Sequence, residues 1–222
     1  MTDLRAPMRL LLDLVLPVRC AGCGRPEHAW CPACHAGVDG PFPVRRRGGP
    51  PMYALAAYAG PARRAVLAYK ERGRRDLAAP LGRMLGAALP SLPGVQPCAG
   101  TWVLVPAPSR PSAARLRGGS HMLRLARHTA ATLAESGRAA AVAPALRLHR
   151  RTRDSVGLDP AARAANLAGG MLPNPAGCPP PDTSVVVLDD VITTGATAAA
   201  CVATLARAGV TVTTVLALTV AG

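Results

Sequence analysis

Aromatic side chains are scarce in this 222-residue chain: they make up 3% of it, whereas hydrophobic residues of all kinds make up 50%. A core must therefore be built mainly from alanine, valine and leucine, and few side chains remain to stack on nucleic-acid bases. The hydrophobic fraction argues against a disordered chain. Acidic residues are also few, with 12 Asp and Glu against 26 Lys and Arg, and Lys70 is the only lysine. The net charge of +14 favours anionic partners such as phosphates, nucleic acid or an acidic protein.

Long hydrophobic runs are absent too. The longest N-terminal run, Leu10 to Leu16, is interrupted by Asp13 and is far shorter than the about 20 residues that a membrane span needs. Arg19 stands where a signal-peptide cleavage site would need a small residue. We expect no membrane span and a cytoplasmic protein with reduced thiols. The N-terminus is predicted to form an amphipathic helix, because its apolar residues recur at helical spacing: Leu4, Met8, Leu11, Leu12, Val15 and Leu16.

Four of the seven cysteines form two C-x-x-C pairs, Cys20 with Cys23 and Cys31 with Cys34. Four thiolates in so short a segment predict a compact, structural Zn²⁺ site, because zinc takes four such ligands in a tetrahedron. The alternative is a redox-active or disulfide-bonded pair, which is uncommon in cytosolic proteins because their thiols are kept reduced. The nearby His28 and His35 could compete as ligands, but we do not expect them to bind. Three isolated cysteines are expected to be inert: Cys98, Cys178 and Cys201.

The segment from Gly37 to Pro51 is rich in proline and glycine and contains three consecutive arginines, which is typical of a linker. We place a domain boundary near residue 50, with the helix, zinc knuckle and linker in residues 1–50 and a larger domain in 51–222. The larger domain alternates predicted strands and helices, which indicates an α/β fold with a mostly parallel sheet covered on both faces. Strands are expected at 52–59, 101–105, 139–148, 184–188 and 211–220, helices at 61–89, 122–136 and 197–208, and a loop at 169–182.

The most informative segment reads Asp189-Asp190-Val-Ile-Thr-Thr-Gly-Ala-Thr197, directly after a β-branched run. It would lie at the carboxyl end of a parallel strand, where open α/β sheets bind ligands, and at a helix N-terminus, which favours phosphate. Gly195 permits close approach of the backbone, and the threonines add hydroxyl donors. Asp189 and Asp190 could bind ribose hydroxyls or a magnesium ion. Together these features describe a sugar-phosphate site. The alternative is a strand cap followed by a helix N-cap.

This segment resembles the phosphoribosyl-pyrophosphate (PRPP) loop of type I phosphoribosyltransferases. Taken with the cysteine pairs, the chain resembles the ComF family of competence-associated proteins along nearly its whole length. Four motifs carry the resemblance besides the cysteines and the loop: Tyr69-Lys70-Glu71-Arg72-Gly73, Val105-Pro106-Ala107-Pro108, an arginine run at Arg110, Arg115 and Arg117, and Arg163 to Asn166 ahead of Gly169.

The resemblance implies a type I phosphoribosyltransferase fold and a Mg²⁺-dependent reaction in which PRPP loses pyrophosphate and a phosphoribosyl group passes to an acceptor. It implies that Asp189 and Asp190 are catalytic and hold the ribose. The phosphate would bind to Thr193, Thr194, Gly195, Ala196 and Thr197. Candidates for binding pyrophosphate are Lys70, Arg72 and Arg110.

The chain departs from the family pattern at two places. The family reads Arg-Gly-Phe-Asn-Gln where this chain has Arg117-Gly118-Gly119-Ser120-His121, and Ser155 stands where a glutamine is common. Both departures remove amide groups that would touch a substrate, so the acceptor and the occurrence of turnover stay open. His121 is a weak candidate for a general base, and a packing or surface role is the alternative.

A second hypothesis is a non-catalytic protein on the same scaffold that assists DNA uptake through weak contacts with single-stranded DNA or with competence proteins. Its arginines suit phosphate contacts, although the six aromatic residues offer no evident stacking platform. A zinc-dependent interaction protein is a third possibility, but it leaves the phosphate loop unexplained. The sequence leaves the oligomeric state open.

Overall fold

The computed structural model describes residues 18–46, 48–109, 114–115, 118–149 and 169–222. Several sequence predictions concern residues outside these ranges: the amphipathic N-terminal helix, Arg110, Arg117, Ser155 and the 163–166 motif. Among the described residues, no helix has the length and apolarity needed to cross a membrane.

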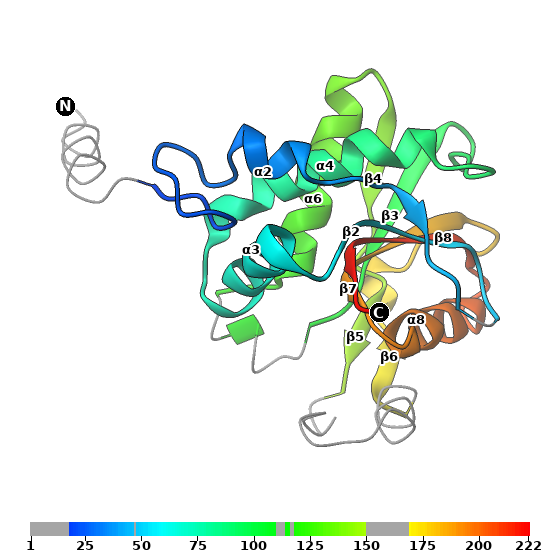
Figure 1. The fold of residues 1–222 in the computed structure, drawn as a ribbon. Helices are drawn as coiled ribbons and strands as arrows, with labels where there is room; N and C mark the ends of the chain where they lie inside the picture. The colour runs from blue at the N-terminus through cyan, green and yellow to red at the C-terminus, as the bar shows by residue number, and fades with distance from the viewer. Residues whose placement is uncertain (1–17, 47, 110–113, 116–117, 150–168) are drawn as a thin grey trace, which may run out of the picture.

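A six-stranded sheet forms the centre of the molecule (Figure 1). Its order is β1 (Phe42–Pro43), β2 (Met52–Ala57), β8 (Thr211–Val220), β7 (Ser184–Ile192), β3 (Thr101–Pro106) and β4 (Ala139–Val142). All neighbouring pairs are parallel except β1 and β2, which are antiparallel. The predicted α/β class with a mostly parallel sheet is therefore confirmed.

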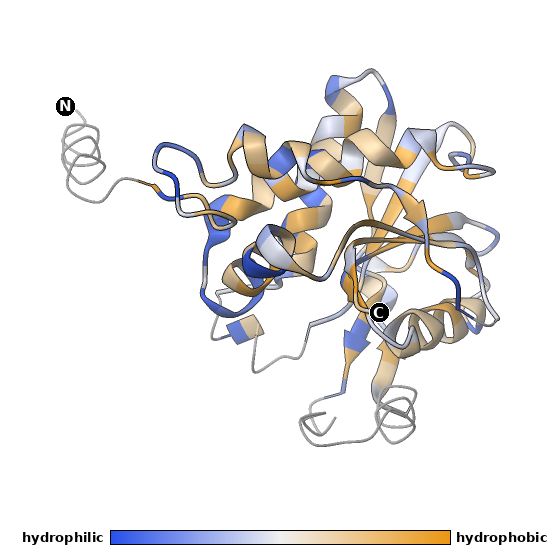
Figure 2. Ribbon diagram, viewed as in Figure 1, coloured by the Kyte–Doolittle hydropathy of each residue, from blue (hydrophilic) through white to orange (hydrophobic). Residues whose placement is uncertain are grey.

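Helices cover both faces of this sheet. On one face lie α3 (Gly60–Glu71), α4 (Ala78–Ala88) and α6 (His121–Glu135), and on the other lies α8 (Ala196–Ala206) with a small antiparallel sheet of β5 (Leu146–Leu148) and β6 (Met171–Pro173). Figure 2 shows the sheet and the inner sides of the helices to be mostly hydrophobic, with hydrophilic residues gathered on outer loops and exposed helix turns. The structure thus buries two layers of apolar side chains, as parallel sheets require.

The centre of β7 shows how the sequence produces this double burial. Val186 and Leu188 pack with the α4 and α6 side, and Val185 and Val187 pack with the α8 side. Successive side chains of a strand point to opposite faces, so a strand buried on both faces reads as an unbroken apolar run.

Three elements predicted in the larger domain are divided or of a different type in the structure. The predicted strand at 139–148 is two strands in different sheets, β4 and β5, because Pro144 between them has no N–H for a strand ladder. The predicted loop at 169–182 contains β6, which pairs with β5 across a long stretch of sequence. The predicted helix at 61–89 is divided at its charged centre: α3 ends at Glu71 and a 3₁₀ turn, Arg75–Leu77, precedes α4.

The N-terminal cysteine segment packs directly on the larger domain. Cys20, Cys31 and Cys34 belong to the same buried cluster as Tyr53 and Leu55 of β2. The predicted linker also contributes β1, which pairs with β2. The domain boundary near residue 50 stays a prediction.

The connections of the sheet change direction between β3 and β7. From β3 the chain continues through α6 to β4 on one side, and from β7 it continues through α8 to β8 on the other side. The loops that follow these two neighbouring strands therefore run apart at their carboxyl ends. Open α/β sheets bind ligands at such a switch point.

Candidate functional site

The four paired cysteines form one group whose ligand atoms all lie within 4.8 Å of one another. The Sγ atoms of Cys20 and Cys34 are 3.7 Å apart, and those of Cys23 and Cys31 are 3.6 Å apart. Zinc–thiolate bonds of about 2.3 Å in a regular tetrahedron place the sulfurs about 3.8 Å apart, so the spacing fits a zinc ion. It does not fit a disulfide, whose sulfurs would be about 2.05 Å apart. The four-cysteine cluster can thus hold a metal such as zinc, and neither His28 nor His35 belongs to it.

Local backbone geometry shapes this cluster. A Cβ atom on Gly22 would lie 2.7 Å from the Cys34 sulfur, so only glycine fits there. Gly24 adopts a left-handed φ of 81° and donates its N–H to the Cys20 carbonyl. The N–H of Cys31 donates to the Cys20 sulfur at 3.4 Å. Burial opposes the Cys20 thiolate, but such backbone N–H groups outweigh it and lower the pKa of this thiol, whereas burial and the neighbouring cysteines raise the pKa of Cys34.

A second cluster of polar groups lies at the switch point and centres on the buried carboxylate of Asp190. The Lys70 ammonium of α3 lies 2.8 Å from Oδ2 and 3.1 Å from Oδ1 of this carboxylate. Nε2 of His121, the first residue of α6, lies 2.9 Å from Oδ2. Burial by itself disfavours charge on Asp190, but Lys70 and the hydrogen bond with His121 outweigh it and hold the pKa of Asp190 below its usual range. Asp190 is therefore an ionised carboxylate in neutral solution.

Asp189 points to the opposite face of the sheet. It pairs in register with Ala217, which packs on the α8 side, and its Oδ1 accepts the N–H of Asp190 at 2.8 Å. Burial, together with the negative charge of Asp190, raises the pKa of Asp189 to about 7. The sequence placed both carboxylates beyond a strand ending at Leu188, but β7 continues to Ile192, so strand geometry separates them.

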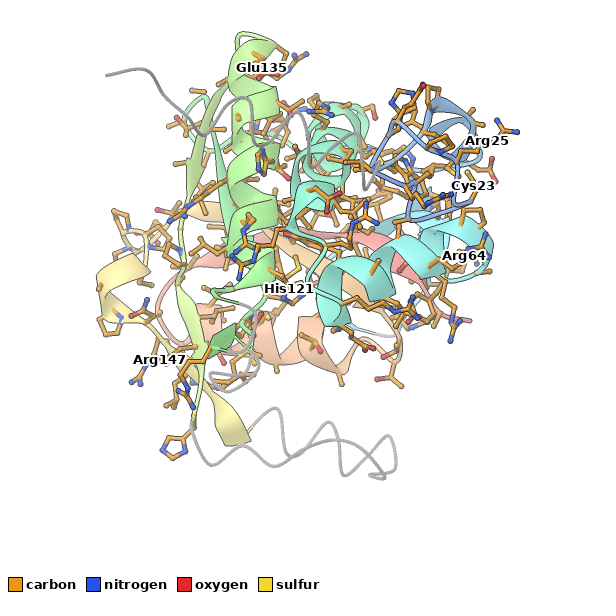
Figure 3. The ribbon with its side chains drawn as sticks, turned by 90° about the vertical axis from the view of Figure 1, so that its left-hand side faces the viewer. Cys23, Arg25, Arg64, His121, Glu135 and Arg147 are labelled. Atoms are coloured by element: carbon orange, nitrogen blue, oxygen red, sulfur yellow. The ribbon has the colours of Figure 1, made fainter. Side chains whose placement is uncertain are left out.

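His121 is buried and is held from several directions. Its Nδ1 lies 3.0 Å from the hydroxyl of Ser109, a residue in the segment that follows β3. The Tyr69 hydroxyl donates to the His121 carbonyl at 2.6 Å, and the Tyr69 ring contacts the imidazole edge to face. Figure 3 shows His121 at the end of α6 that faces α3, while Cys23 lies in a different part of the molecule.

The predicted phosphate loop joins β7 to α8. Gly195 has a φ of 84°, and Thr193 and Thr194 are exposed. The Arg46 guanidinium donates to the Thr193 carbonyl through Nε at 3.0 Å and to the Ala221 carbonyl at 3.1 Å. Its carbon chain lies 3.5 Å from where a Gly195 Cβ would stand. The loop is thus a glycine turn at a helix N-terminus with an arginine beside it, an arrangement that suits an anion.

The structure brings some of the predicted residues together and leaves others apart. Lys70 of α3 forms an ion pair with Asp190, which lies on β7 three residues before the Thr193–Thr197 loop. Arg72 is exposed at the end of α3, and Arg110 lies outside the described residues. Sequence reasoning did not assign roles to Ser109, Tyr69 or Arg46. The only available signals were the Tyr-Lys-x-Arg-Gly motif, which contains Tyr69, and the arginine run at the linker, which contains Arg46.

Compared with known proteins, the chain matches no protein-family model and no curated protein.

Proposed function

We propose that the protein binds PRPP with Mg²⁺ and transfers its phosphoribosyl group to an acceptor, as a type I phosphoribosyltransferase-like protein of the ComF kind. One observation carries the proposal: the Asp-Asp-Val-Ile-Thr-Thr-Gly-Ala-Thr segment lies at the carboxyl end of β7, at the switch point of a mostly parallel sheet. The residue types of that segment and the position of its loop both favour a sugar phosphate as the ligand.

The 5′-phosphate would bind at the Thr193–Thr197 loop. The left-handed Gly195 turns the backbone toward the first amides of α8, and the exposed threonine hydroxyls flank that turn. Helix N-terminal amides and their dipole favour an anion. Arg46 adds a positive charge at the edge of the loop.

The ribose and pyrophosphate would bind around Asp190. Both oxygens of this carboxylate are occupied by Lys70, so a ribose hydroxyl gains access when Lys70 moves away. The Lys70 side chain is 38% exposed, and it would exchange its partner for the pyrophosphate. The pyrophosphate would bring the Mg²⁺ with it, since Mg²⁺ in such sites is bound largely through substrate phosphates. Asp190 would then stabilise the positive charge that develops at the ribose as pyrophosphate departs.

The proposal is tested by measuring PRPP binding in the presence of MgCl₂ by calorimetry, for the wild type and for Gly195→Val. The substitution places a branched side chain in the phosphate loop, and we expect it to abolish PRPP binding. Gly137→Val is the matched control, because Gly137 has a similar φ of 75° and open space around its Cβ position, but lies after α6, away from the loop. Both variants carry the same kind of backbone strain, so a difference in binding reports the loop itself.

The proposal fails if Gly195→Val binds PRPP like the wild type, or if the wild type does not bind PRPP at all. A magnesium-dependent assay of pyrophosphate release, run with a panel of bases and amines, then tests transfer. Binding that depends on the loop without turnover for any acceptor would favour the non-catalytic alternative, a phosphoribosyltransferase scaffold that assists DNA uptake.

A further inference from the structure

Three side chains from separate segments form a continuous chain of hydrogen bonds: Ser109 after β3, His121 at the start of α6, and Asp190 near the end of β7. The Ser109 hydroxyl is 3.0 Å from Nδ1 of the imidazole, and Nε2 is 2.9 Å from the Asp190 carboxylate. A hydroxyl, an imidazole and a carboxylate in this order make the arrangement that activates a serine nucleophile.

The direction of the hydrogen bonds follows from Asp190. An ionised carboxylate only accepts hydrogen bonds, so Nε2 carries the proton that His121 donates to it. In the neutral imidazole the other nitrogen, Nδ1, then has a lone pair that faces Ser109. The serine hydroxyl therefore donates to a basic nitrogen, and the imidazolium that forms after proton transfer is stabilised by Asp190.

The imidazole is held in this orientation by its surroundings. His121 and Asp190 are 5% and 4% exposed, and the Tyr69 ring packs against the imidazole while its hydroxyl binds the His121 carbonyl. Ser109 is only partly buried. A base locked in place beside a partly accessible hydroxyl is what nucleophilic catalysis requires.

The N-terminus of α6 adds an electrostatic contribution. Ser120 is the N-cap of this 15-residue helix, and its hydroxyl lies 3.4 Å from that of Ser109. The partial positive charge at a helix N-terminus stabilises negative charge. It would favour both an attacking serine oxygen and the oxyanion that forms when the oxygen adds to a carbonyl.

We propose that Ser109 is a nucleophile that takes the acyl group from small activated acyl esters, with His121 as its base and Asp190 as the group that orients His121. The Ser109 Oγ–acyl bond forms as the bond between the acyl carbon and the leaving oxygen breaks. The serine proton passes to Nδ1 of His121 and then to the departing alkoxide. Water releases the acyl group by the reverse route, with His121 accepting the proton of the water and returning it to Ser109.

A fluorophosphonate probe tests the nucleophile. It phosphonylates an activated serine: the Oγ–P bond forms, the P–F bond breaks, fluoride leaves and the proton goes to the base. We expect the full-length wild type to be labelled at Ser109, as located by peptide mass spectrometry, and to hydrolyse 4-nitrophenyl acetate. Ser109→Ala should abolish both. His121→Gln should slow both by about 100-fold or more, because it removes the base while keeping a polar side chain of similar length.

Ser136→Ala is the control, since Ser136 is an exposed serine at the far end of α6 whose hydroxyl donates to the Leu133 carbonyl. Its labelling rate should equal that of the wild type, and thermal unfolding confirms that each variant is folded. An unlabelled wild type, a label on another residue, or an unchanged rate in folded His121→Gln overturns the proposal. If a variant fails to fold, the labelling of the wild type alone decides whether the proposal holds. Labelling needs neither PRPP nor Mg²⁺, so the outcome is independent of the proposed function.

Discussion

Replacing Cys23 by serine should remove the metal and destabilise the whole molecule. Cys23 is the one exposed member of the four-cysteine cluster, so Cys23→Ser removes a thiolate without removing buried side-chain volume. The other three cysteines are buried, and they pack with Trp30, Tyr53 and Leu55 in the main core cluster. The free energy of metal binding is therefore coupled to the packing of this part of the sheet.

The size of the effect follows from linkage between binding and folding. Each tenfold loss of zinc affinity removes about 1.4 kcal/mol from the free energy of unfolding when zinc saturates the wild type. A 100-fold loss would cost about 2.7 kcal/mol. In a chain of 222 residues, a loss of 1 kcal/mol lowers the unfolding temperature by about 2–4 °C, so we expect a decrease of about 5–11 °C.

Elemental analysis and thermal unfolding measure the two consequences. The wild type should contain about one zinc per chain, and a chelator should lower its unfolding temperature toward that of Cys23→Ser. Cys178→Ser is the control, because Cys178 is an isolated thiol outside the cluster. The reasoning is refuted if Cys23→Ser keeps both its zinc and its unfolding temperature, or if the folded wild type is metal-free with a Cys20–Cys34 disulfide.

Two further predictions concern charge. Burial and the negative charge of Asp190 raise the pKa of Asp189 to about 7 in the folded protein, whereas it is about 3.9 in the unfolded chain. The contribution of Asp189 to stability is therefore full below about pH 4 and is lost as the pH rises through 7. The Asp189→Asn variant, whose amide oxygen can still accept the Asp190 N–H, should flatten the dependence of the free energy of unfolding on pH between pH 4 and 7, measured by urea unfolding. Asp39→Asn is the control, because Asp39 is exposed and its replacement should leave this dependence unchanged. An unchanged pH dependence in Asp189→Asn would contradict the raised pKa of Asp189. Single-stranded DNA should bind weakly and without sequence preference, with an affinity that falls steeply with salt in a fluorescence-anisotropy titration, because contacts would be made by scattered arginines. Tight or salt-insensitive binding would reveal a recognition surface that this reasoning missed.

The elements with a strong local signal were predictable from the sequence. The β-branched run at 184–188, the helix after Gly195 and the strand at 211–220 all occur close to the predicted positions. Pairing between distant segments was not predictable. β6 is three residues long and is stabilised by β5 more than 20 residues earlier, so its own sequence carries too little signal.

The extension of β7 through its two carboxylates has a different cause. Acidic residues disfavour a buried strand when they are considered alone, because burial penalises their charge. In the folded protein the charge of Asp190 is compensated by Lys70, while Asp189 has a pKa near neutrality and its Oδ1 accepts a hydrogen bond from the Asp190 backbone N–H. Tertiary contacts thus offset the penalty for Asp190, while Asp189 reduces it by keeping its proton up to near-neutral pH.

The candidate site residues differ in the same way in how far the sequence reveals them. The predicted phosphate loop is contiguous, and its residue types alone suggest an anion. The partners of His121, in contrast, lie 12, 52 and 69 residues away at Ser109, Tyr69 and Asp190. No local pattern connects them. The pairing of β3 with β7 brings Ser109 near Asp190, and the packing of α3 and α6 on the same face of the sheet adds Tyr69 and His121.

The contacts of Asp190 show how one carboxylate can take part in both proposed activities. Lys70 binds both of its oxygens, whereas His121 binds Oδ2 alone. When Lys70 moves to an anionic ligand, Oδ1 becomes available to a sugar hydroxyl, while Oδ2 still orients the imidazole. Departure of Lys70 also removes a positive charge from Asp190, which leaves the carboxylate to stabilise positive charge on the ribose or on His121. The position of Lys70 would therefore control both proposed activities through the same ion pair.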